Sequence, residues 1–221
     1  MFDGIARRYD LLNRLLTLGM DRRWRRYAVD RLALEPGDRV LDLACGTGDV
    51  AAEVLRRWPG SSVVGADPAA EMLRLAKVKV PTLETIRCSA EKLPFPDASF
   101  AALTVAFGLR NFADRGLGLA EIGRVLRPGG RLAVLEFAQP HRGPLQRFYR
   151  WYLGSALPVI GGLLSRSAAY RYLPESIDAF PVPDDLVAEM GRYGLAVTER
   201  RSWLGGTVWY YRGLRSQAGQ D

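Results

Sequence analysis

A short glycine-containing segment, residues 42–48 (DLACGTG), constrains the fold of this chain more than any other feature. An apolar stretch at residues 39–43 leads into it, and a helical pattern over residues 50–58 follows. Glycine has no Cβ, so it turns the backbone sharply and lets a ligand approach the main chain closely. A strand, a glycine turn and a helix in this order predict the start of a nucleotide-binding α/β domain.

The alternation of strands and helices continues along the chain. It predicts a parallel sheet covered by helices on both faces. We expect strands at residues 39–43, 62–66, 83–87, 100–106 and 131–137, with a turn at 127–130. We expect helices at residues 5–16, 22–32, 50–58, 67–77, 114–126 and 184–193, with Asp21 and Asp114 as caps.

Two further strands, at residues 196–202 and 207–211, are expected to form a hairpin-like ending. Five parallel strands followed by such a pair predict an α/β protein. The specific prediction is a Rossmann-like S-adenosylmethionine-dependent methyltransferase fold, a seven-stranded, mostly parallel sheet with one antiparallel strand. A chain of 221 residues fits one domain, spanning 1–221. We expect it to carry N-terminal helices over about 1–34 and an aromatic-rich helical insertion over about 141–180.

Composition excludes several classes of protein. No apolar run reaches the roughly 18–20 residues that span a bilayer, and we expect no signal peptide. The 2 cysteines cannot form a disulfide framework, which predicts a cytoplasmic protein. Two cysteines and one histidine, far apart, do not make a zinc site, so no metal is expected.

The formal net charge is +7, and almost all basic residues are arginines. Such a surface suits anionic partners, although a merely solvated surface is the alternative. Arginines alternate with aromatic residues at 22–27 and 146–152. These segments fit an anionic membrane surface, single-stranded nucleic acid, or packing within the insertion. We expect transient membrane contact and no nucleic acid, because no Asn-Pro-Pro-Tyr motif follows the fourth strand.

Two cofactors fit the glycine segment. Gly46, Gly48 and Ala51 satisfy the dinucleotide pattern, which leaves a nicotinamide cofactor open. Asp42 favours S-adenosylmethionine, because its carboxylate suits a cationic sulfonium and amino group and would repel a pyrophosphate. Asp67, at the end of the second strand, is placed to accept hydrogen bonds from ribose hydroxyls.

Several segments together resemble the ubiquinone/menaquinone biosynthesis C-methyltransferase family, the demethylmenaquinone methyltransferase group. They are residues 1–10, 12–13, 21–26, 42–49, 91–97, 107–111, 124–131, 135–137 and 172–177. The glycine segment is shared by many methyltransferases. Phe-Gly-Leu-Arg-Asn at 107–111 and the Tyr-Leu-x-x-Ser-Ile pattern at 172–177 are far more specific to this family.

The resemblance implies methyl transfer from S-adenosylmethionine to a ring carbon of a polyprenylated quinol. It implies cofactor contacts from Thr47, within the glycine segment, and from Asp67, Ser89, Ala90 and Ala106. The glycine segment itself adds Asp42, Gly46 and Gly48 as candidate cofactor residues. Three positions depart from the family pattern: Ser89 replaces Asp or Asn, Ala106 replaces Ser, and Tyr211 replaces His.

A carbon nucleophile requires a deprotonated quinol, and therefore a group that stabilises the phenolate. Arg110 is the candidate cation, since its guanidinium stays protonated. The alternative for Arg110 and Asn111 is an ion pair in the loop and a cap for the following helix. Asn111 could hold the ring oxygen or orient a water. Tyr9 is expected to close over the site, with core packing as the alternative. A homodimer is left open, and His141 is expected to be a surface residue.

Overall fold

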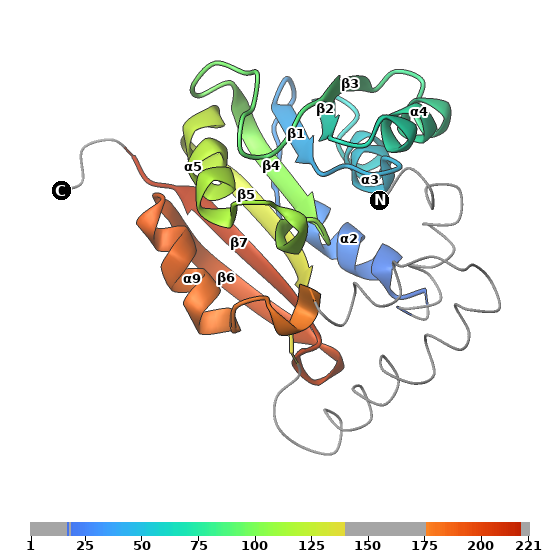
Figure 1. Ribbon diagram of the computed structural model, residues 1–221. Coiled ribbons are helices and arrows are strands. Elements are labelled where there is room, and N and C mark those ends of the chain that lie inside the picture. The colour runs from blue at the N-terminus through green and yellow to red at the C-terminus, as the bar shows by residue number, and fades with distance from the viewer. Residues whose placement is uncertain (1–16, 18, 140–175, 218–221) are drawn as a thin grey trace.

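The computed structural model describes residues 17, 19–139 and 176–217 of the chain. Seven strands form one sheet in the order β3-β2-β1-β4-β5-β7-β6 (Figure 1). The strands are β1 (Arg39–Leu43), β2 (Ser62–Asp67), β3 (Glu84–Arg87), β4 (Phe100–Ala106), β5 (Leu126–Phe137), β6 (Leu195–Trp203) and β7 (Val208–Arg215). The first five are mutually parallel, and β7 is antiparallel to both β5 and β6. The predicted fold is therefore confirmed.

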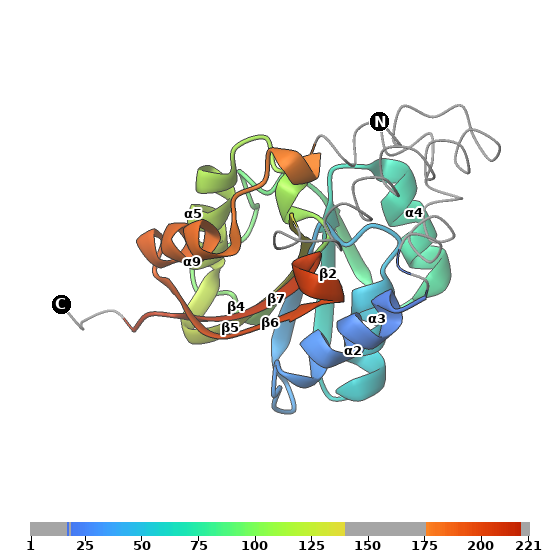
Figure 2. The same ribbon diagram turned by 90° about the horizontal axis from the view of Figure 1, so that it is seen from below.

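Helices cover both faces of this sheet (Figure 2). They are α2 (Asp21–Asp30), α3 (Asp49–Arg57), α4 (Ala70–Lys79), α5 (Arg115–Val125) and α9 (Pro183–Arg192). One apolar cluster joins α2 and α3 to the sheet through Trp24, Val29 and Val54. A second joins α5 and α9 to the opposite face through Ile122 and Met190. Both faces of the parallel strands are thus buried, as a parallel sheet requires.

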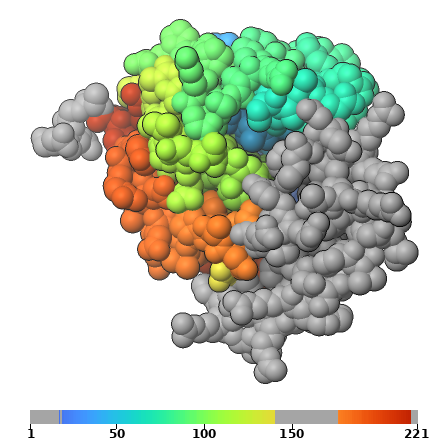
Figure 3. Space-filling view, viewed as in Figure 1, coloured from blue at the N-terminus to red at the C-terminus, as the bar shows by residue number. Residues whose placement is uncertain are grey.

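The helices α5 and α9 lie side by side on the outer surface of their face (Figure 3). Arg115 of α5 and Glu189 of α9 form an ion pair with Nε and Oε2 2.8 Å apart. Asp114 caps α5 as predicted, because its Oδ1 accepts a hydrogen bond from the N–H of Leu117 at 2.9 Å.

Two local predictions are wrong. Asp21 does not cap α2 but is its first residue, and its side chain instead pairs with Arg25 and accepts a hydrogen bond from Thr17. Residues 127–130 do not separate a helix from a strand. Strand β5 already begins at Leu126, and these residues bulge within it, so that Phe100 pairs with Leu126 while Ala102 pairs with Arg131.

The bounds of β1 and β4 agree with the prediction, and other element boundaries differ from it by up to four residues. Two short elements were not predicted, the 3₁₀ turns η2 (Leu109–Asn111) and η4 (Leu204–Gly206). The expected helix at 5–16 and most of the expected insertion at 141–180 lie outside the described residues. Within the described part, Ile177 and Phe180 are buried against the core.

Candidate active site

The order of the strands places the site. The chain proceeds outward from β1 to β2 and β3, then returns to the other side of β1 with β4. Neighbouring helices therefore leave the sheet in opposite directions at the carboxyl ends of β1 and β4, and such a switch point opens a crevice for ligands. The glycine segment follows β1, and residues 107–111 follow β4, so both meet at this point (Figure 1).

The backbone at the switch point is strained in both segments. Ala44 has φ of 55° and Phe107 has φ of 60°, a left-handed conformation that is uncommon for residues with a Cβ. Gly108 must be glycine, because a Cβ there would lie 2.5 Å from the Cβ of Ala44. The two segments are thus pressed together, and strain of this kind concentrates at functional sites.

Asp67 holds the glycine segment in place. Its Oδ2 accepts a hydrogen bond from the N–H of Gly46 at 2.9 Å, and its Oδ1 accepts one from the N–H of Ala69 at 2.9 Å. Each carboxylate oxygen has two lone pairs. Asp67 can therefore order the loop and still accept hydrogen bonds from a ligand.

Asp42 is almost completely buried at the end of β1. Its Oδ1 accepts a hydrogen bond from Oγ1 of Thr104 at 2.7 Å, and its Oδ2 accepts one from the N–H of Ala51 at 3.1 Å. Burial raises the pKa of Asp42 to about 7, against these hydrogen bonds, which lower it. A cationic ligand beside Asp42 would favour the ionised carboxylate.

Thr47, within the glycine segment, contacts α4. Its Oγ1 accepts a hydrogen bond from Nζ of Lys79 at 2.9 Å, and the same Nζ lies 2.5 Å from Oδ1 of Asp49. Asp49 in turn pairs with Arg25, whose Nη1 lies 3.0 Å from Oδ2 of Asp49. A chain of charges therefore links α2, α3 and α4 around the segment.

Two adjoining hollows open over the glycine segment, and they share Ala44 and Gly46. The Asp67 hollow is lined by Ala44, Gly46, Asp67, Pro68, Met72, Phe107, Gly108 and Asn111. The Asp42 hollow is lined by Arg25, Asp42, Ala44, Cys45, Gly46, Thr47, Asp49, Val50 and Ala106. Of the predicted site residues, Asp42, Gly46, Thr47, Asp67, Ala106 and Asn111 therefore come together at one place.

Other predicted residues lie elsewhere. Gly48 has φ of 80° and begins α3, where a Cβ would lie 3.1 Å from the Cβ of Ala76, so it serves the packing of two helices. Ser89 is exposed and Ala90 is buried in the core after β3. Both follow the carboxyl end of β3, beside β2, and their contact with the cofactor stays a prediction. Tyr9 and His141 lie outside the described residues.

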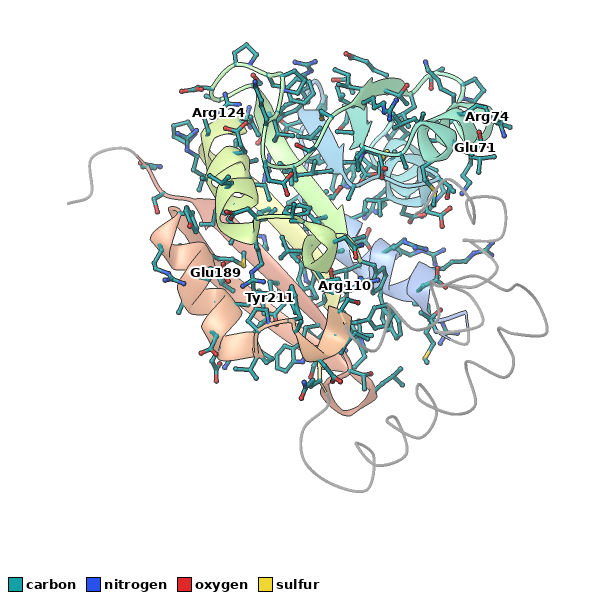
Figure 4. The ribbon with its side chains drawn as sticks, in the orientation of Figure 1. Glu71, Arg74, Arg110, Arg124, Glu189 and Tyr211 are labelled. Carbon is teal, nitrogen blue, oxygen red and sulfur yellow. The ribbon has the colours of Figure 1, made fainter. Side chains whose placement is uncertain are left out.

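Arg110 does not stand free in the crevice. Its Nη1 lies 2.6 Å from Oε1 of Glu136 and donates a hydrogen bond to the carbonyl oxygen of Phe107 at 2.7 Å. Figure 4 shows Arg110 at η2, beside the carboxyl end of the sheet. The alternative for Arg110, an ion pair, thus describes its contacts, although the partner Glu136 belongs to β5 and not to the loop.

Sequence reasoning missed four residues of the site. Arg25 was seen only as part of a basic segment, and Glu136 only as part of a family motif. Lys79 and Met72 lie on a helix with no motif of its own. The buried charge of Glu136 in an apolar strand was a usable signal, because an unpaired buried carboxylate is rare. Nothing in the sequence indicated that Lys79 and Met72 would lie at the site.

Among solved structures, the fold is shared with methyltransferases. A chain from the complex of the Haloferax volcanii Trm112 methyltransferase activator with a methyltransferase superposes with a TM-score of 0.72, at 20% identity, covering 98% of each chain. A SAM-dependent methyltransferase from Aquifex aeolicus superposes with a TM-score of 0.64, at 18% identity, covering 86% of this chain and 89% of that one. The fold is thus the Rossmann-like fold of these methyltransferases.

Residues 1–215 match the ubiE/COQ5 methyltransferase family, and the chain belongs to that family. It is 53% identical over 203 residues to a Thermus thermophilus protein named demethylmenaquinone methyltransferase, covering 89% of this chain and 92% of that protein. It is 47% identical over 223 residues to a Syntrophotalea carbinolica protein named ubiquinone/menaquinone biosynthesis C-methyltransferase UbiE, covering 99% and 94%.

The cofactor is S-adenosylmethionine, and the residues present fit it. Asp42 and Asp67 bring two carboxylates to the hollows, where a dinucleotide would need room for an anionic pyrophosphate. A sulfonium and an amino group are cationic and suit such surroundings. The nicotinamide alternative is therefore set aside.

Proposed function

We propose that this chain methylates a ring carbon of a polyprenylated quinol, with conversion of demethylmenaquinol to menaquinol as the favoured reaction. The relatives that carry the names of quinone methyltransferases support this substrate. The single observation that carries it furthest is that Asn111 and Asp67 line the same hollow. The segment most specific to quinone methyltransferases thus adjoins the cofactor residues.

The cofactor supplies an electrophilic methyl group. The protein must then align the ring carbon behind that group, and orientation alone can contribute up to about 7–11 kcal/mol. Phe107 and Gly108 line the hollow next to Asn111 and give it an apolar wall. We assign Asn111 to the ring oxygen, because its side-chain amide can both donate and accept a hydrogen bond.

Arg110 supplies the positive charge of this segment. Its guanidinium is always protonated and presents its N–H donors in a planar fork beside Glu136. We propose that Arg110 stabilises the negative charge that develops on the ring oxygen when the quinol is deprotonated. We propose that Tyr9, outside the described residues, closes the site over the substrate.

The test is an assay with purified protein, S-adenosylmethionine carrying a labelled methyl group, and reduced demethylmenaquinol. Mass spectrometry should find the label on the quinone ring. Parallel reactions contain a demethylated ubiquinol precursor, or total RNA. Label in RNA, or in no quinol, would contradict the proposal, whereas preference between the two quinols would define the natural substrate.

We further propose that the protein meets its tailed substrate at an anionic membrane surface. Arg22, Arg23 and Arg26 are exposed on α2. A hollow of about 300 Å³ between α2 and α3 is lined by Arg22, Arg25, Arg26, Asp49, Ala52, Glu53 and Arg56. Arginines there can bind lipid phosphates. The second basic segment, 146–152, lies outside the described residues.

No helix among the described residues is long and apolar enough to cross a membrane. Contact with a bilayer through α2 would therefore be peripheral.

A further inference from the structure

Arg25 is a basic residue buried beside the glycine segment. Only 7% of its surface is exposed. It comes from α2, far from the glycine segment in sequence, yet it lines the Asp42 hollow together with Asp42 and Thr47. Its guanidinium carbon lies 5.7 Å from the centre of the Phe107 ring. The side chain therefore lies between the two segments that meet at the switch point.

The guanidinium is held from one side. Its Nη1 pairs with Asp21 of the same helix and lies 3.0 Å from Oδ2 of Asp49 on α3. Asp49 is shared with Lys79, whose Nζ lies 2.5 Å from its Oδ1. Two cations and two carboxylates thus balance one another, and the position of Arg25 is determined before any ligand arrives.

One donor of this buried group is unused. The Nε of Arg25 is inaccessible to solvent and has no hydrogen-bond partner among the described residues. A buried donor without an acceptor costs about 1–3 kcal/mol, so native structures seldom leave one unpaired. An acceptor from a ligand in the Asp42 hollow would satisfy it.

The hollow presents one buried carboxylate and one buried guanidinium. The methionine end of the cofactor carries the opposite pair, a cationic α-amino group and an anionic α-carboxylate. We propose that Arg25 binds the α-carboxylate of S-adenosylmethionine, while Asp42 lies toward its amino group. The planar guanidinium suits a carboxylate because it presents its N–H groups in a fixed fork.

This inference goes beyond the proposed function, because it concerns the cofactor alone. The competing explanation is that Arg25 only fastens α2 to α3 through Asp21 and Asp49. The two explanations differ in which ligands should lose affinity when Arg25 is replaced. Loss of a residue that binds the carboxylate lowers the affinity only for ligands that have a carboxylate. Loss of a residue that only joins α2 to α3 lowers the affinity for every ligand of the site.

The test compares S-adenosylmethionine with its decarboxylated form, which lacks only the α-carboxylate. Calorimetry measures both ligands on wild type, Arg25→Gln and Arg25→Lys. Arg57→Gln is the control, since Arg57 lies on the adjoining helix α3 and its side chain is 48% exposed. Neither ligand contains a quinol, so the result is independent of the methyl acceptor.

Wild type should bind S-adenosylmethionine roughly tenfold or more tightly than the decarboxylated form, the equivalent of about 1.4 kcal/mol. Arg25→Gln should remove most of that difference and leave the affinity for the decarboxylated form within about twofold. Arg25→Lys, which keeps the charge without the fork, should retain part of the difference. Arg57→Gln should change neither affinity.

Equal losses of affinity for both ligands in Arg25→Gln would overturn the proposal and assign Arg25 a structural role only. An undiminished difference between the two ligands would overturn it as well. If Arg25→Gln does not fold, Arg25→Lys decides alone, because its affinity must fall for S-adenosylmethionine and hold for the decarboxylated form.

Discussion

Arg110 and Glu136 form a buried ion pair at the edge of the crevice, with Nη1 2.6 Å from Oε1 and side chains only 8% and 1% exposed. Oε2 of Glu136 also accepts a hydrogen bond from the backbone N–H of Arg110 at 3.1 Å. The pair therefore ties η2 to the end of β5. Asn111, the next residue, is held in the Asp67 hollow as a consequence.

Arg110→Ala should lower turnover by about 100-fold or more, the usual loss when a group that stabilises developing charge is removed. The affinity for S-adenosylhomocysteine should change by less than about threefold, because Arg110 does not line either cofactor hollow. Arg110→Lys should recover only part of the activity, since lysine lacks the planar fork. Steady-state kinetics and calorimetry measure the two effects.

Glu136→Gln is the companion variant. It should lower the free energy of unfolding by about 3–5 kcal/mol, because it leaves a buried guanidinium without its partner. If Arg110 serves only the ion pair, folded Glu136→Gln and Arg110→Ala should lose turnover equally. A much larger loss in Arg110→Ala identifies a role toward the substrate.

Asp67→Ala should weaken binding of S-adenosylmethionine by about 1–3 kcal/mol, the range for hydrogen bonds to a charged group. Part of this loss comes from the N–H groups of Gly46 and Ala69, which lose their acceptor. Asp67→Asn keeps one acceptor and should lose less. Calorimetry on folded protein measures both, and an unchanged affinity in Asp67→Ala would remove Asp67 from the cofactor site.

Asp42 should make cofactor binding depend on pH. Because burial raises its pKa to about 7, the carboxyl is protonated in the free protein at lower pH. A cationic ligand prefers the ionised form, so affinity for S-adenosylmethionine should fall as pH drops from about 8 to 6. Asp42→Asn should bind weakly with little pH dependence. Calorimetry measures the affinity for S-adenosylmethionine across this pH range. If the affinity of Asp42→Asn depended on pH as that of wild type does, the role of Asp42 would be contradicted.

The same group has an opposite effect on stability. The folded state binds the proton of Asp42 more tightly than the unfolded chain, whose pKa is about 4. Its contribution to the free energy of unfolding therefore decreases as pH rises from about 4 to 7. Without cofactor, Asp42→Asn should gain stability relative to wild type over that window, measured by denaturant unfolding.

Gly108→Ala should disrupt the crevice, because the new Cβ would lie 2.5 Å from that of Ala44. We expect a destabilisation of about 1–3 kcal/mol, the usual cost of overpacking, and a loss of cofactor affinity. The double variant Gly108→Ala with Ala44→Gly removes the opposing Cβ and should recover much of both. Failure of the second substitution to recover either would place the strain elsewhere.

Vesicle binding tests the membrane proposal. Wild type should bind anionic vesicles at low salt, with each basic residue near the surface contributing about 1 kcal/mol, and should dissociate as salt rises. Arg22→Glu with Arg23→Glu should weaken binding and activity on long-tailed quinol while sparing a short-tailed analogue. Arg74→Glu with Lys77→Glu, an equal charge change on α4, is the control. Equal loss on both quinols would contradict the proposal.

Most of the sheet could be predicted from the sequence alone. The apolar runs of β1 and β4 are buried on both faces, and such strands carry a strong local signal. The position of the glycine segment could also be predicted from the sequence. Its turn needs positive φ at Gly46 and Gly48, and glycine adopts positive φ most readily. The place of Asp67 beside this segment could be predicted from its position at the end of β2.

Contacts between distant segments were decided only by the tertiary structure. Arg25 reaches the Asp42 hollow because α2 packs on α3, and Arg110 meets Glu136 because β4 and β5 are adjacent. No local pattern encodes which charge a buried charge will meet, since pairing depends on desolvation and distance in the folded chain. The sequence by itself therefore determined the fold and the glycine segment, whereas tertiary packing decided which charged residues surround that segment.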